Sequence, residues 1–503
     1  MPELLDARRL HEKRAFKKAI HVYEAYLKEK PNDPEALRLM GLAFAQSNDI
    51  ERAITCFTKA LIHSPDNAHV HHLLGNAYKQ TNQFDKAFIH YQAAATLMPD
   101  NSNACQNALF YQGLLSLQHN NIDKAADEFH ALLSEYPEHV GALINLGVIA
   151  LKRNEGQLAI DYFGKALAFD EHNEEARNNL AATFIHHNRF ENALTHYTEL
   201  LKKSPNDTEY LYNAGVAHMT LGHLNEATHQ FNAVLKFQPH HFAALTNLAS
   251  IALRNSNRSE AITYLTRAHD INPQDKSCAF LLNAMTGNTE NQTTCPEYAQ
   301  NLFDHYALYY DQHMRVQLKY SLPEHIAKLV HSLYADSLSV KNTLDLGCGT
   351  GLCGNVLREI STHLVGVDIS SQMIEQARAK NLYDCLIEQD LISFLENESN
   401  TYELIIAADV LPYFSELEAF FNLIQQHLTP QGIVILSVEE STHKAFQLED
   451  TARFSHHPDY IKDLANTNHL DLIFHEPVIG RMQAHLGVPV LLYAFTLKQN
   501  EQR

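Results

Sequence analysis

The chain has 503 residues, with 39 Lys and Arg against 59 Asp and Glu, and a formal charge of −20. That length exceeds what one hydrophobic core supports and predicts two to four domains. The acidic excess is largest in residues 291–503, which hold 13 basic and 27 acidic side chains. Because phosphate backbones are bound by basic surfaces, this charge argues against nucleic acid as a substrate.

Cysteine and histidine usage points to a reducing compartment and to no metal site. The seven cysteines are scattered and form no Cys-x-x-Cys pair, which favours free buried thiols in the cytoplasm. We find no N-terminal signal and no apolar stretch of about 18 residues, so we expect no membrane segment. Many of the 32 histidines stand in adjacent pairs, whose side chains point in different directions on a helix and cannot readily share an ion.

The first half of the chain repeats with a period of 34 residues. Each repeat has a small residue that lets two helices approach, a large apolar residue four positions later and, in seven of eight repeats, a proline that ends the second helix. The fifth repeat has Glu171 in place of the proline, and one slip of four residues falls between residues 101 and 105. The small residues are Ala19, Ala53, Ala87, Ala125, Ala159, Ala193, Ala227 and Ala261.

This pattern resembles eight tetratricopeptide (TPR) repeats. The resemblance implies an all-α TPR superhelix over residues 1–275, whose concave face binds a protein or peptide partner. Four asparagines with the same spacing fall on the inner wall of the last four repeats: Asn145, Asn179, Asn213 and Asn247. Their amides could hold the backbone of an extended peptide, as in the asparagine ladder of O-GlcNAc transferase, or they could only help adjacent helices to pack.

A capping helix and a linker, residues 276–295, are expected after the array. Asp345, Gly347, Gly349 and Gly351 then lie in a strand-to-turn pattern, residues 342–354, in which backbone N–H groups can approach a ligand before a helix begins. The same glycines also fit a dinucleotide fingerprint, which is weak evidence alone. Asp345 favours a different ligand, because a carboxylate two residues before the first glycine could meet a cationic amino-acid group.

Three further acids end strand patterns in the next sixty residues. Asp368 follows strand 363–367, Asp390 follows strand 385–389, and Asp409 follows strand 403–408. Together with the glycine turn they resemble the class I S-adenosylmethionine-dependent methyltransferases from about Gln300 to the C-terminus, in a bacterial group that carries N-terminal TPR repeats. The resemblance implies that Asp345 and the three glycines hold the methionine end of the cofactor. It also places the ribose on Asp368 and the adenine amino group on Asp390, with Asp409 nearby.

The resemblance implies an α/β Rossmann-like domain, residues 296–503, with a mostly parallel seven-stranded sheet whose last strand is antiparallel. We expect the sheet to be completed by strands 432–438, 470–476 and 490–497, with helices at 416–428 and 458–468. Met373 either packs on the adenine or belongs to a helix core. The segment 296–325 is expected to close over the cofactor, with Tyr306, Tyr310 and His313 shaping the acceptor pocket.

The acceptor side of the site is less well defined by the sequence. Asp409, Tyr413 and His456 are the candidates for a base or for groups that position the acceptor. Arg453, in a loop 439–457, and Arg481, in a turn before the last strand, either bind an acceptor carboxylate or pair with surface acids.

The pattern used for exocyclic amines of bases, Asp or Asn followed by Pro-Pro and an aromatic residue, does not follow the fourth strand. Three functional hypotheses result. The first is a methyltransferase whose repeats recruit a protein partner or substrate. The second is a small-molecule methyltransferase with a scaffolding array, and the third is a binding protein that retains the cofactor without turnover.

Overall fold

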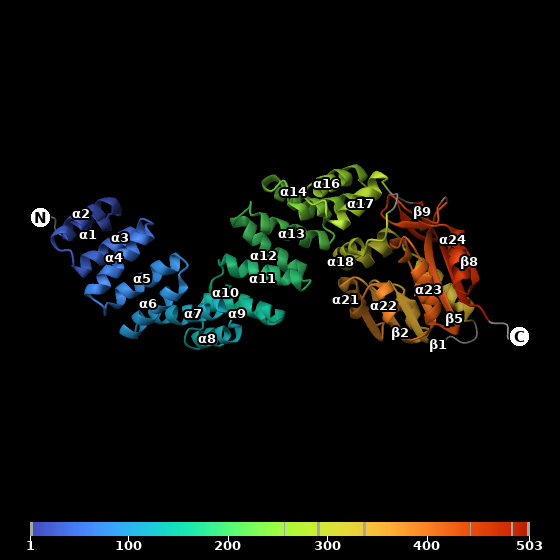
Figure 1. Cartoon of the computed structure of the whole chain (residues 1–503), viewed down its shortest axis with the longest axis horizontal. Coiled ribbons are helices and arrows are strands. Elements are labelled where there is room, and N and C mark those ends of the chain that lie inside the picture. The colour runs from blue at the N-terminus through green and yellow to red at the C-terminus, as the bar shows by residue number, and fades with distance from the viewer. Residues whose placement is uncertain are drawn as a thin grey trace. The chain divides into compact units, whose positions relative to one another are not determined.

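The computed structural model describes residues 4–255, 257–288, 292–334, 339–442, 444–483 and 486–499 (Figure 1). Its packing divides the chain into two compact units, Met1–Leu200 and Leu201–Arg503, so that the repeat array contributes to both. The domain limits expected from the sequence, 1–275, 276–295 and 296–503, therefore stay a prediction. Residues 289–291 of the expected linker lie outside the described residues.

The first unit consists of helices that pack in successive pairs. The bounds of its helices are α1 Leu4–Glu12, α2 Phe16–Glu29, α3 Pro34–Gln46, α4 Ile50–His63, α5 Ala68–Gln80, α6 Phe84–Leu97, α7 Ser102–Gln118, α8 Ile122–Glu135, α9 Val140–Lys152, α10 Gly156–Phe169, α11 Glu174–His186 and α12 Phe190–Lys203. Helix α7 has 17 residues where α3 and α5 have 13, so the slip seen in the sequence is one additional helical turn.

The second unit begins with two more pairs and a capping helix. These are α13 Thr208–Thr220, α14 Leu224–Phe237, α15 Phe242–Arg254, α16 Arg258–Ile271 and α17 Lys276–Thr286. The eight predicted repeats are thus confirmed as the pairs from α1/α2 to α15/α16. All eight predicted alanines are 0% exposed, and the residues four positions later, Tyr23 to Leu265, are at most 1% exposed.

Two further periodic features, which the sequence analysis did not use, fix the ends of the helices. The turn inside most repeats contains a residue with positive φ, a conformation that asparagine and glycine tolerate: Asn48, Asn82, Asn120, Asn154, Asn188 and Gly222. The first helix of each later repeat, and α17, begins after a side chain that accepts a backbone N–H: Asp33, Asn67, Asn101, His139, Asn173, Asp207, His241 and Asp275.

The rest of the second unit is an α/β domain. Its strands are β1 Val340–Leu346, β2 Ser361–Asp368, β3 Cys385–Glu388, β4 Tyr402–Ala407, β5 Leu428–Glu440, β6 Phe446–Leu448, β7 Phe454–His456, β8 Leu470–Gln483 and β9 Leu486–Leu497. Its helices are α18 Pro296–Gln312, the π-helical turn η1 His313–Gln317, α19 Leu322–Leu333, α20 Gly354–Arg358, α21 Ser371–Ala379, α22 Leu391–Asn397, the short helix η2 Leu411–Tyr413, α23 Glu418–His427 and α24 Pro458–Thr467.

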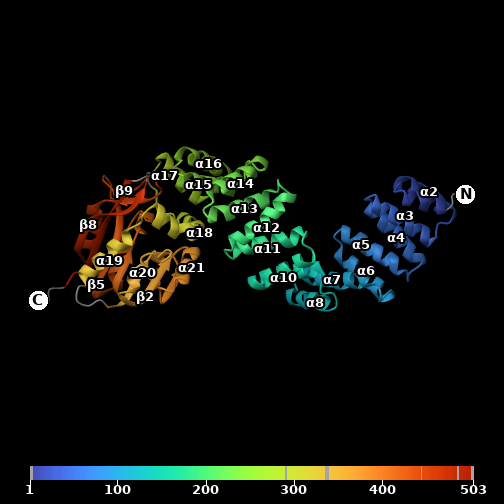
Figure 2. The ribbon, with the colours of Figure 1, turned by 180° about the vertical axis from the view of Figure 1, so that it is seen from behind.

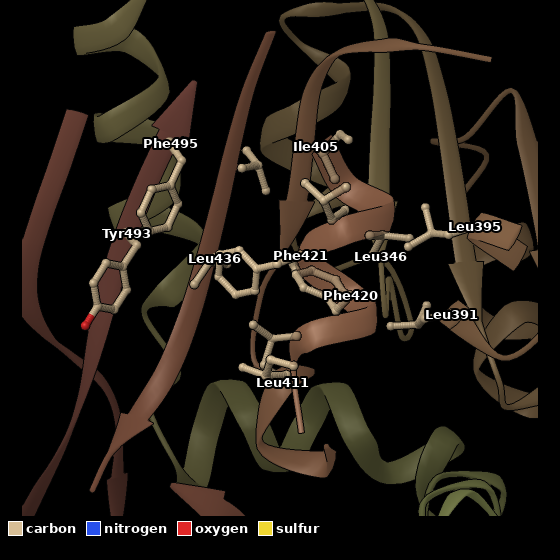
Figure 3. Close-up of a cluster of buried hydrophobic side chains, with 14 of the residues drawn as sticks. Leu346, Leu391, Leu395, Ile405, Leu411, Phe420, Phe421, Leu436, Tyr493 and Phe495 are labelled. Carbon is tan, nitrogen blue, oxygen red and sulfur yellow. The ribbon is translucent and has the colours of Figure 1, made fainter. Parts of the chain in front are cut away.

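The sheet has parallel strands in the order β3-β2-β1-β4-β5, and β9 then pairs antiparallel with both β5 and β8. Helices α22, α23 and α24 cover one face, where Phe420 and Phe421 of α23 pack over Ile405 and Leu436 (Figures 1 and 3). Helices α19 and α20 cover the other face, which is seen from behind (Figure 2). The carboxyl ends of the parallel strands therefore meet at one edge, where ligands of such sheets bind.

The predicted number of seven strands is wrong, because the sheet has nine strands within the described residues. All seven expected strands form, and the two additional ones, β6 and β7, are a hairpin inside the predicted loop 439–457. The hairpin forms because its apolar residues have a surface to cover: Leu448 and Phe454 are buried in one cluster with Leu281 of the capping helix. Arg258 of the last repeat forms an ion pair with Asp450 at its tip.

Among the described helices, none combines the length and the apolar character that a membrane crossing requires.

Candidate cofactor and acceptor site

The glycine turn after β1 has a backbone that side chains rarely tolerate. Gly347, Gly349 and Gly351 have φ values of 71°, 53° and 85°. A Cβ at Gly347 would lie 2.5 Å from Val410, whereas a Cβ at Gly349 would meet nothing within 4 Å. The turn therefore packs tightly against the end of β4 at Gly347 and is open where a ligand would approach Gly349.

Asp368, at the end of β2, organises this turn. Its carboxylate oxygens accept hydrogen bonds from the N–H groups of Gly349 and Ser370, each at 2.9 Å. Burial raises the pKa of Asp368 to about 6, although these hydrogen bonds lower it. The side chain is thus buried and oriented, and it stands where the sequence analysis placed an acceptor for ribose hydroxyls.

Asp345 of β1 is more deeply buried than Asp368. It is 1% exposed and accepts a hydrogen bond of 2.7 Å from the hydroxyl of Tyr383. Burial raises its pKa to about 7, and the tyrosine hydrogen bond offsets only part of that rise. Tyr383 was not foreseen from the sequence, yet it explains Gly354 and Gly366, where a Cβ would lie within 2.8 Å of its ring.

A cavity of about 60 Å³ lies at the carboxyl edge of the sheet, and Asp345, Gly349 and Gly351 are not among its lining residues. It is lined by Gly347, Asp368 and Asp390, and by Ala299 and Phe303 from α18. Met373 is 1% exposed and is not among the lining residues. At about 60 Å³, the cavity is smaller than the about 300–1,000 Å³ that is typical of ligand pockets.

Helix α18, in the predicted lid segment, is held over the glycine turn by two acids. Asp304 accepts a hydrogen bond of 2.6 Å from Ser370 Oγ, and Asp311 pairs with Lys380 at 2.5 Å. Asp311 also accepts a hydrogen bond from Thr350 Oγ1 in the turn itself. Neither acid was predicted from the sequence, although their seven-residue spacing places them on one face of a helix.

The three predicted lid residues lie together. The Tyr306 hydroxyl is hydrogen-bonded to His313 Nδ1, and the rings of Tyr306 and Tyr310 are 5.0 Å apart. Burial raises the pKa of both tyrosines and lowers that of His313. The ring of Tyr306 also faces the guanidinium of Arg254 in the last repeat at 5.1 Å, so this group contacts the array.

A buried ion cluster occupies the acceptor side. Arg453 donates to Asp409 and, at 2.8 Å, to Glu439, while Arg481 donates to Glu439 at 2.9 Å. These four side chains are only 11–14% exposed. Burial raises the pKa of Glu439, but the two guanidinium groups outweigh it and hold the pKa below its usual value. The arginines therefore pair with buried acids and not with surface acids.

The secondary structure around both arginines differs from the prediction. Arg481 lies within β8, paired with Val488 of β9, and not in a turn. Arg453 stands directly before β7, so the hairpin positions it. Glu439, the acid that joins the two, was not predicted, because its partners are 14 and 42 residues away in the sequence.

Tyr413 and His456 have different surroundings. Tyr413 lines the 60 Å³ cavity, and its hydroxyl accepts a hydrogen bond of 3.0 Å from Arg453. His456 donates from Nε2 to the carbonyl oxygens of Phe414 and Ser415 and does not line that cavity. Burial lowers the pKa of His456 to about 4, so the imidazole is neutral at pH 7.

The four ladder asparagines are not equivalent. Asn145 donates to the Gly141 carbonyl oxygen of its own helix at 2.8 Å, whereas Asn179 and Asn213 are half-buried. Asn247 is 8% exposed, and its Nδ2 has no hydrogen-bond partner within the described part of the chain. A group of three or more His, Cys, Asp or Glu that could hold a metal ion was not found among the described residues.

Comparison with known families agrees with this two-part architecture. A model described as "Methyltransferase domain" matches residues 314–474. Models described as "Tetratricopeptide repeat" match residues 6–54, 68–101, 111–174, 150–214 and 212–276, and one described as "TPR repeat" matches residues 41–82. The chain thus carries tetratricopeptide repeats followed by a methyltransferase domain.

Individual relatives match only part of the chain. Ubiquinone biosynthesis O-methyltransferase of Rickettsia prowazekii is 30% identical over 126 residues, which are 24% of this chain and 49% of the relative. The human mitochondrial enzyme of the same name is 24% identical over 112 residues, covering 21% of this chain and 30% of its own length. A solved structure of magnesium protoporphyrin IX methyltransferase from Synechocystis with bound SAM is 18% identical, with a TM-score of 0.28. The match covers 35% of this chain and 79% of that one. The chain therefore spans about half or less of the length of the two ubiquinone biosynthesis O-methyltransferases.

Proposed function

We propose that this protein transfers a methyl group from S-adenosylmethionine to an acceptor that meets the cofactor at the carboxyl edge of the sheet. The observation that carries the proposal is the glycine turn with three positive φ values, tied to a buried Asp368 at the end of β2. The turn offers open space at Gly349, and Asp368 has the chemistry to accept hydrogen bonds from ribose hydroxyls. These residue types therefore suit this cofactor, and the 60 Å³ cavity must widen to admit it.

Each residue has a defined task in this proposal. Asp345 would hold the cationic amino group of the cofactor, whose positive charge would favour the ionised carboxylate. Asp390 faces the adenine amino group and also caps α22 by accepting from the N–H of Ser393 at 3.0 Å. When bound, the cofactor supplies an electrophilic methyl group. The protein aligns the acceptor with it and keeps water out.

On the acceptor side, Tyr413 is the candidate that faces the cavity, and Arg453 fixes its hydroxyl. Asp409 orients Arg453. Asp409 and His456 are the candidates for the base that would take a proton from the acceptor. Tyr306, Tyr310 and His313, which do not line the 60 Å³ cavity, would close the site over a bound cofactor. The relatives are named O-methyltransferases, which supports an oxygen acceptor.

The array supports a protein partner for this reaction, because TPR repeats commonly bind proteins on their concave face. We propose a cytoplasmic protein whose repeats recruit a protein partner or substrate, with the ladder of Asn145, Asn179, Asn213 and Asn247 as the peptide contact. Methylation of a small molecule, with the array as a scaffold, is the second candidate, favoured by the names of the relatives.

The first test is calorimetric titration of the whole protein with S-adenosylhomocysteine and, separately, with NADH. We expect binding of the first ligand only, with a large loss of affinity in Asp368→Ala and a smaller loss in Asp390→Asn. The second variant keeps an N-capping side chain at α22 and replaces a hydrogen-bond acceptor by a donor. Binding of NADH instead would assign the turn to a dinucleotide, and binding of neither ligand would reject the proposal.

The acceptor class is tested with S-adenosylmethionine labelled in its methyl group and added to lysate with the protein. Label in a protein band supports recruitment of a protein substrate, whereas label in the solvent-extractable fraction supports a small molecule. The matched control replaces all four ladder asparagines by alanine. Loss of the labelled band with unchanged cofactor affinity supports the ladder, and equal loss of both contradicts it.

A further inference from the structure

A second cavity, of about 260 Å³, lies on the array side of helix α18 and within the second unit. Its walls come from the last two repeats, from the capping helix α17 and from α18. Apolar side chains supply much of the lining: Met219, Phe242, Leu265, Leu281 and Leu302. It is larger than the cofactor cavity described above, and of the residues assigned to the proposed function only Asn247, the last asparagine of the ladder, lines it.

Arg254, at the end of α15, lines this cavity with a cationic group that lacks an acid partner. Its Nη1 is buried without a hydrogen-bond partner, and it forms no ion pair within the described residues. The guanidinium lies 5.1 Å from the centre of the Tyr306 ring, and this cation–π contact partly stabilises its charge. Since a buried unpaired charge is costly, an anion in the cavity would remove a penalty that the free protein bears.

Asn247 adds a second donor to the same cavity. Its side chain is 8% exposed and lines the cavity, and its Nδ2 has no hydrogen-bond partner among the residues that the structure describes. Burial raises the pKa of the Tyr212 phenol in the same lining, and a polar contact from Asn247 offsets only part of that rise. Asn247 and Arg254 are seven residues apart on one helix, so both donors point from the same face of α15.

The acid in the lining does not neutralise these donors. Asp275 caps α17 by accepting from the N–H of Cys278 at 2.8 Å, and it forms no ion pair with Arg254 within the described residues. The other polar contacts of the lining are likewise internal, since Asn301 donates to Ser277 at 3.3 Å. The cavity therefore combines an apolar body with two unused donors, one of them cationic.

We propose that this cavity binds a carboxylate on a ligand with an apolar body. The carboxylate is held by Arg254 and Asn247, and the apolar part by Met219, Leu265 and Leu281. Two sources share this chemistry, the end or an acidic side chain of a peptide and a small carboxylic acid. The ligand touches Leu302 and His305 of α18, whose other face, with Ala299 and Phe303, lines the cofactor cavity. The inference goes beyond methyl transfer and stands without it.

The test compares acids with their neutral amides on the full-length protein. The probes are 4-phenylbutyrate with 4-phenylbutyramide, and the peptide acetyl-Gly-Ala-Leu-Phe with a free or an amidated C-terminus, measured by calorimetric titration. We expect each acid to bind at least about tenfold more tightly than its amide, because a charge-assisted hydrogen bond contributes about 1.5–3 kcal/mol. The tighter of the two acids identifies the source. Equal binding of acids and amides, or binding of none, overturns the proposal.

Two variants and a control locate the site. Arg254→Gln removes a positive charge, and Asn247→Asp removes a hydrogen-bond donor. Each variant should bind the acids about tenfold more weakly and the amides with unchanged affinity. Arg267→Gln removes an exposed cation of the neighbouring helix α16 outside the cavity and should change nothing. Unchanged acid binding in Arg254→Gln rejects the site.

A thermal melt without ligand checks that Arg254→Gln still folds. Because the change removes a buried unpaired charge, the melting temperature should not fall. If the melting temperature falls, Arg254 has a structural role and the Asn247→Asp variant decides. Equal binding of the acid and its amide to that variant supports the proposal. Tighter binding of the acid than of the amide overturns it.

Discussion

The repeat array and the methyltransferase domain differ in how deeply their ion pairs are buried. In the array, ion pairs lie near the surface, as with Arg38 and Glu35, whose side chains are 24% and 40% exposed. In the domain, Asp409, Glu439, Arg453 and Arg481 are gathered into one cluster that is 11–14% exposed. The array therefore spreads its stability over many small repeated contacts, whereas the domain concentrates interdependent charges beside its candidate site.

Breaking the buried cluster should have the largest effect. Arg453→Gln leaves Asp409 and Glu439 with one guanidinium between them, so we expect a loss of about 3–5 kcal/mol in the free energy of unfolding. Arg38→Gln in the array is the matched control and should cost at most about 1 kcal/mol. Urea unfolding followed by circular dichroism measures both. Similar losses in the two variants would remove the contrast between the regions.

Replacing the buried Asp345 should have the second largest effect, a pH-dependent change in the free energy of unfolding. Its pKa of about 7 in the folded protein exceeds the usual 3.8, so its contribution to stability is full below about pH 4 and is lost as pH rises through 7. Asp345→Asn keeps an acceptor for Tyr383 and removes this loss. The variant should therefore match wild type near pH 4 and exceed it at pH 8, by at most about 4 kcal/mol. A constant difference between melting temperatures at pH 5 and pH 8 would contradict this assignment.

A packing test in the array should have a moderate effect. Gly147 lies against the ring of Phe163, and an added Cβ would come within 2.5 Å of it. Gly147→Ala should cost about 1–3 kcal/mol, since overpacking forces neighbouring atoms to shift. Gly164→Ala in the same repeat is the control, because its Cβ would meet nothing within 4 Å, and it should stabilise α10 by up to about 1 kcal/mol. Chemical denaturation that ranks the two variants in the reverse order would reject the packing argument.

The smallest effect is expected at the turns inside the repeats. Asn154 has a φ of 60°, a conformation that costs alanine about 1 kcal/mol and glycine almost nothing. Asn154→Ala should therefore lower the melting temperature slightly, and Asn154→Gly should leave it close to wild type. Equal melting temperatures for both variants would show that the positive φ carries no cost there.

The same contrast explains what could be predicted from the sequence. The repeats were predictable because each alanine and aromatic residue acts within one or two neighbouring helices, so their spacing is visible along the chain. The glycine turn and Asp368 were also visible, since a local backbone shape requires those residues. Glu439 and Tyr383 were not, because their partners come from other elements of the sheet. The β6–β7 hairpin was missed for a similar reason, as the surface that it covers belongs to α17.

That hairpin also determines where the chain can be divided for separate expression. Leu448 and Phe454 are buried against α17 and the last repeat, and Arg258 of that repeat binds Asp450. A fragment starting at residue 296 would leave these apolar side chains uncovered and would loosen the segment that carries Arg453. We expect such a fragment to aggregate, and a fragment starting at residue 201 to remain monodisperse in size-exclusion chromatography. The practical unit for expressing the α/β domain would then include two repeats of the array.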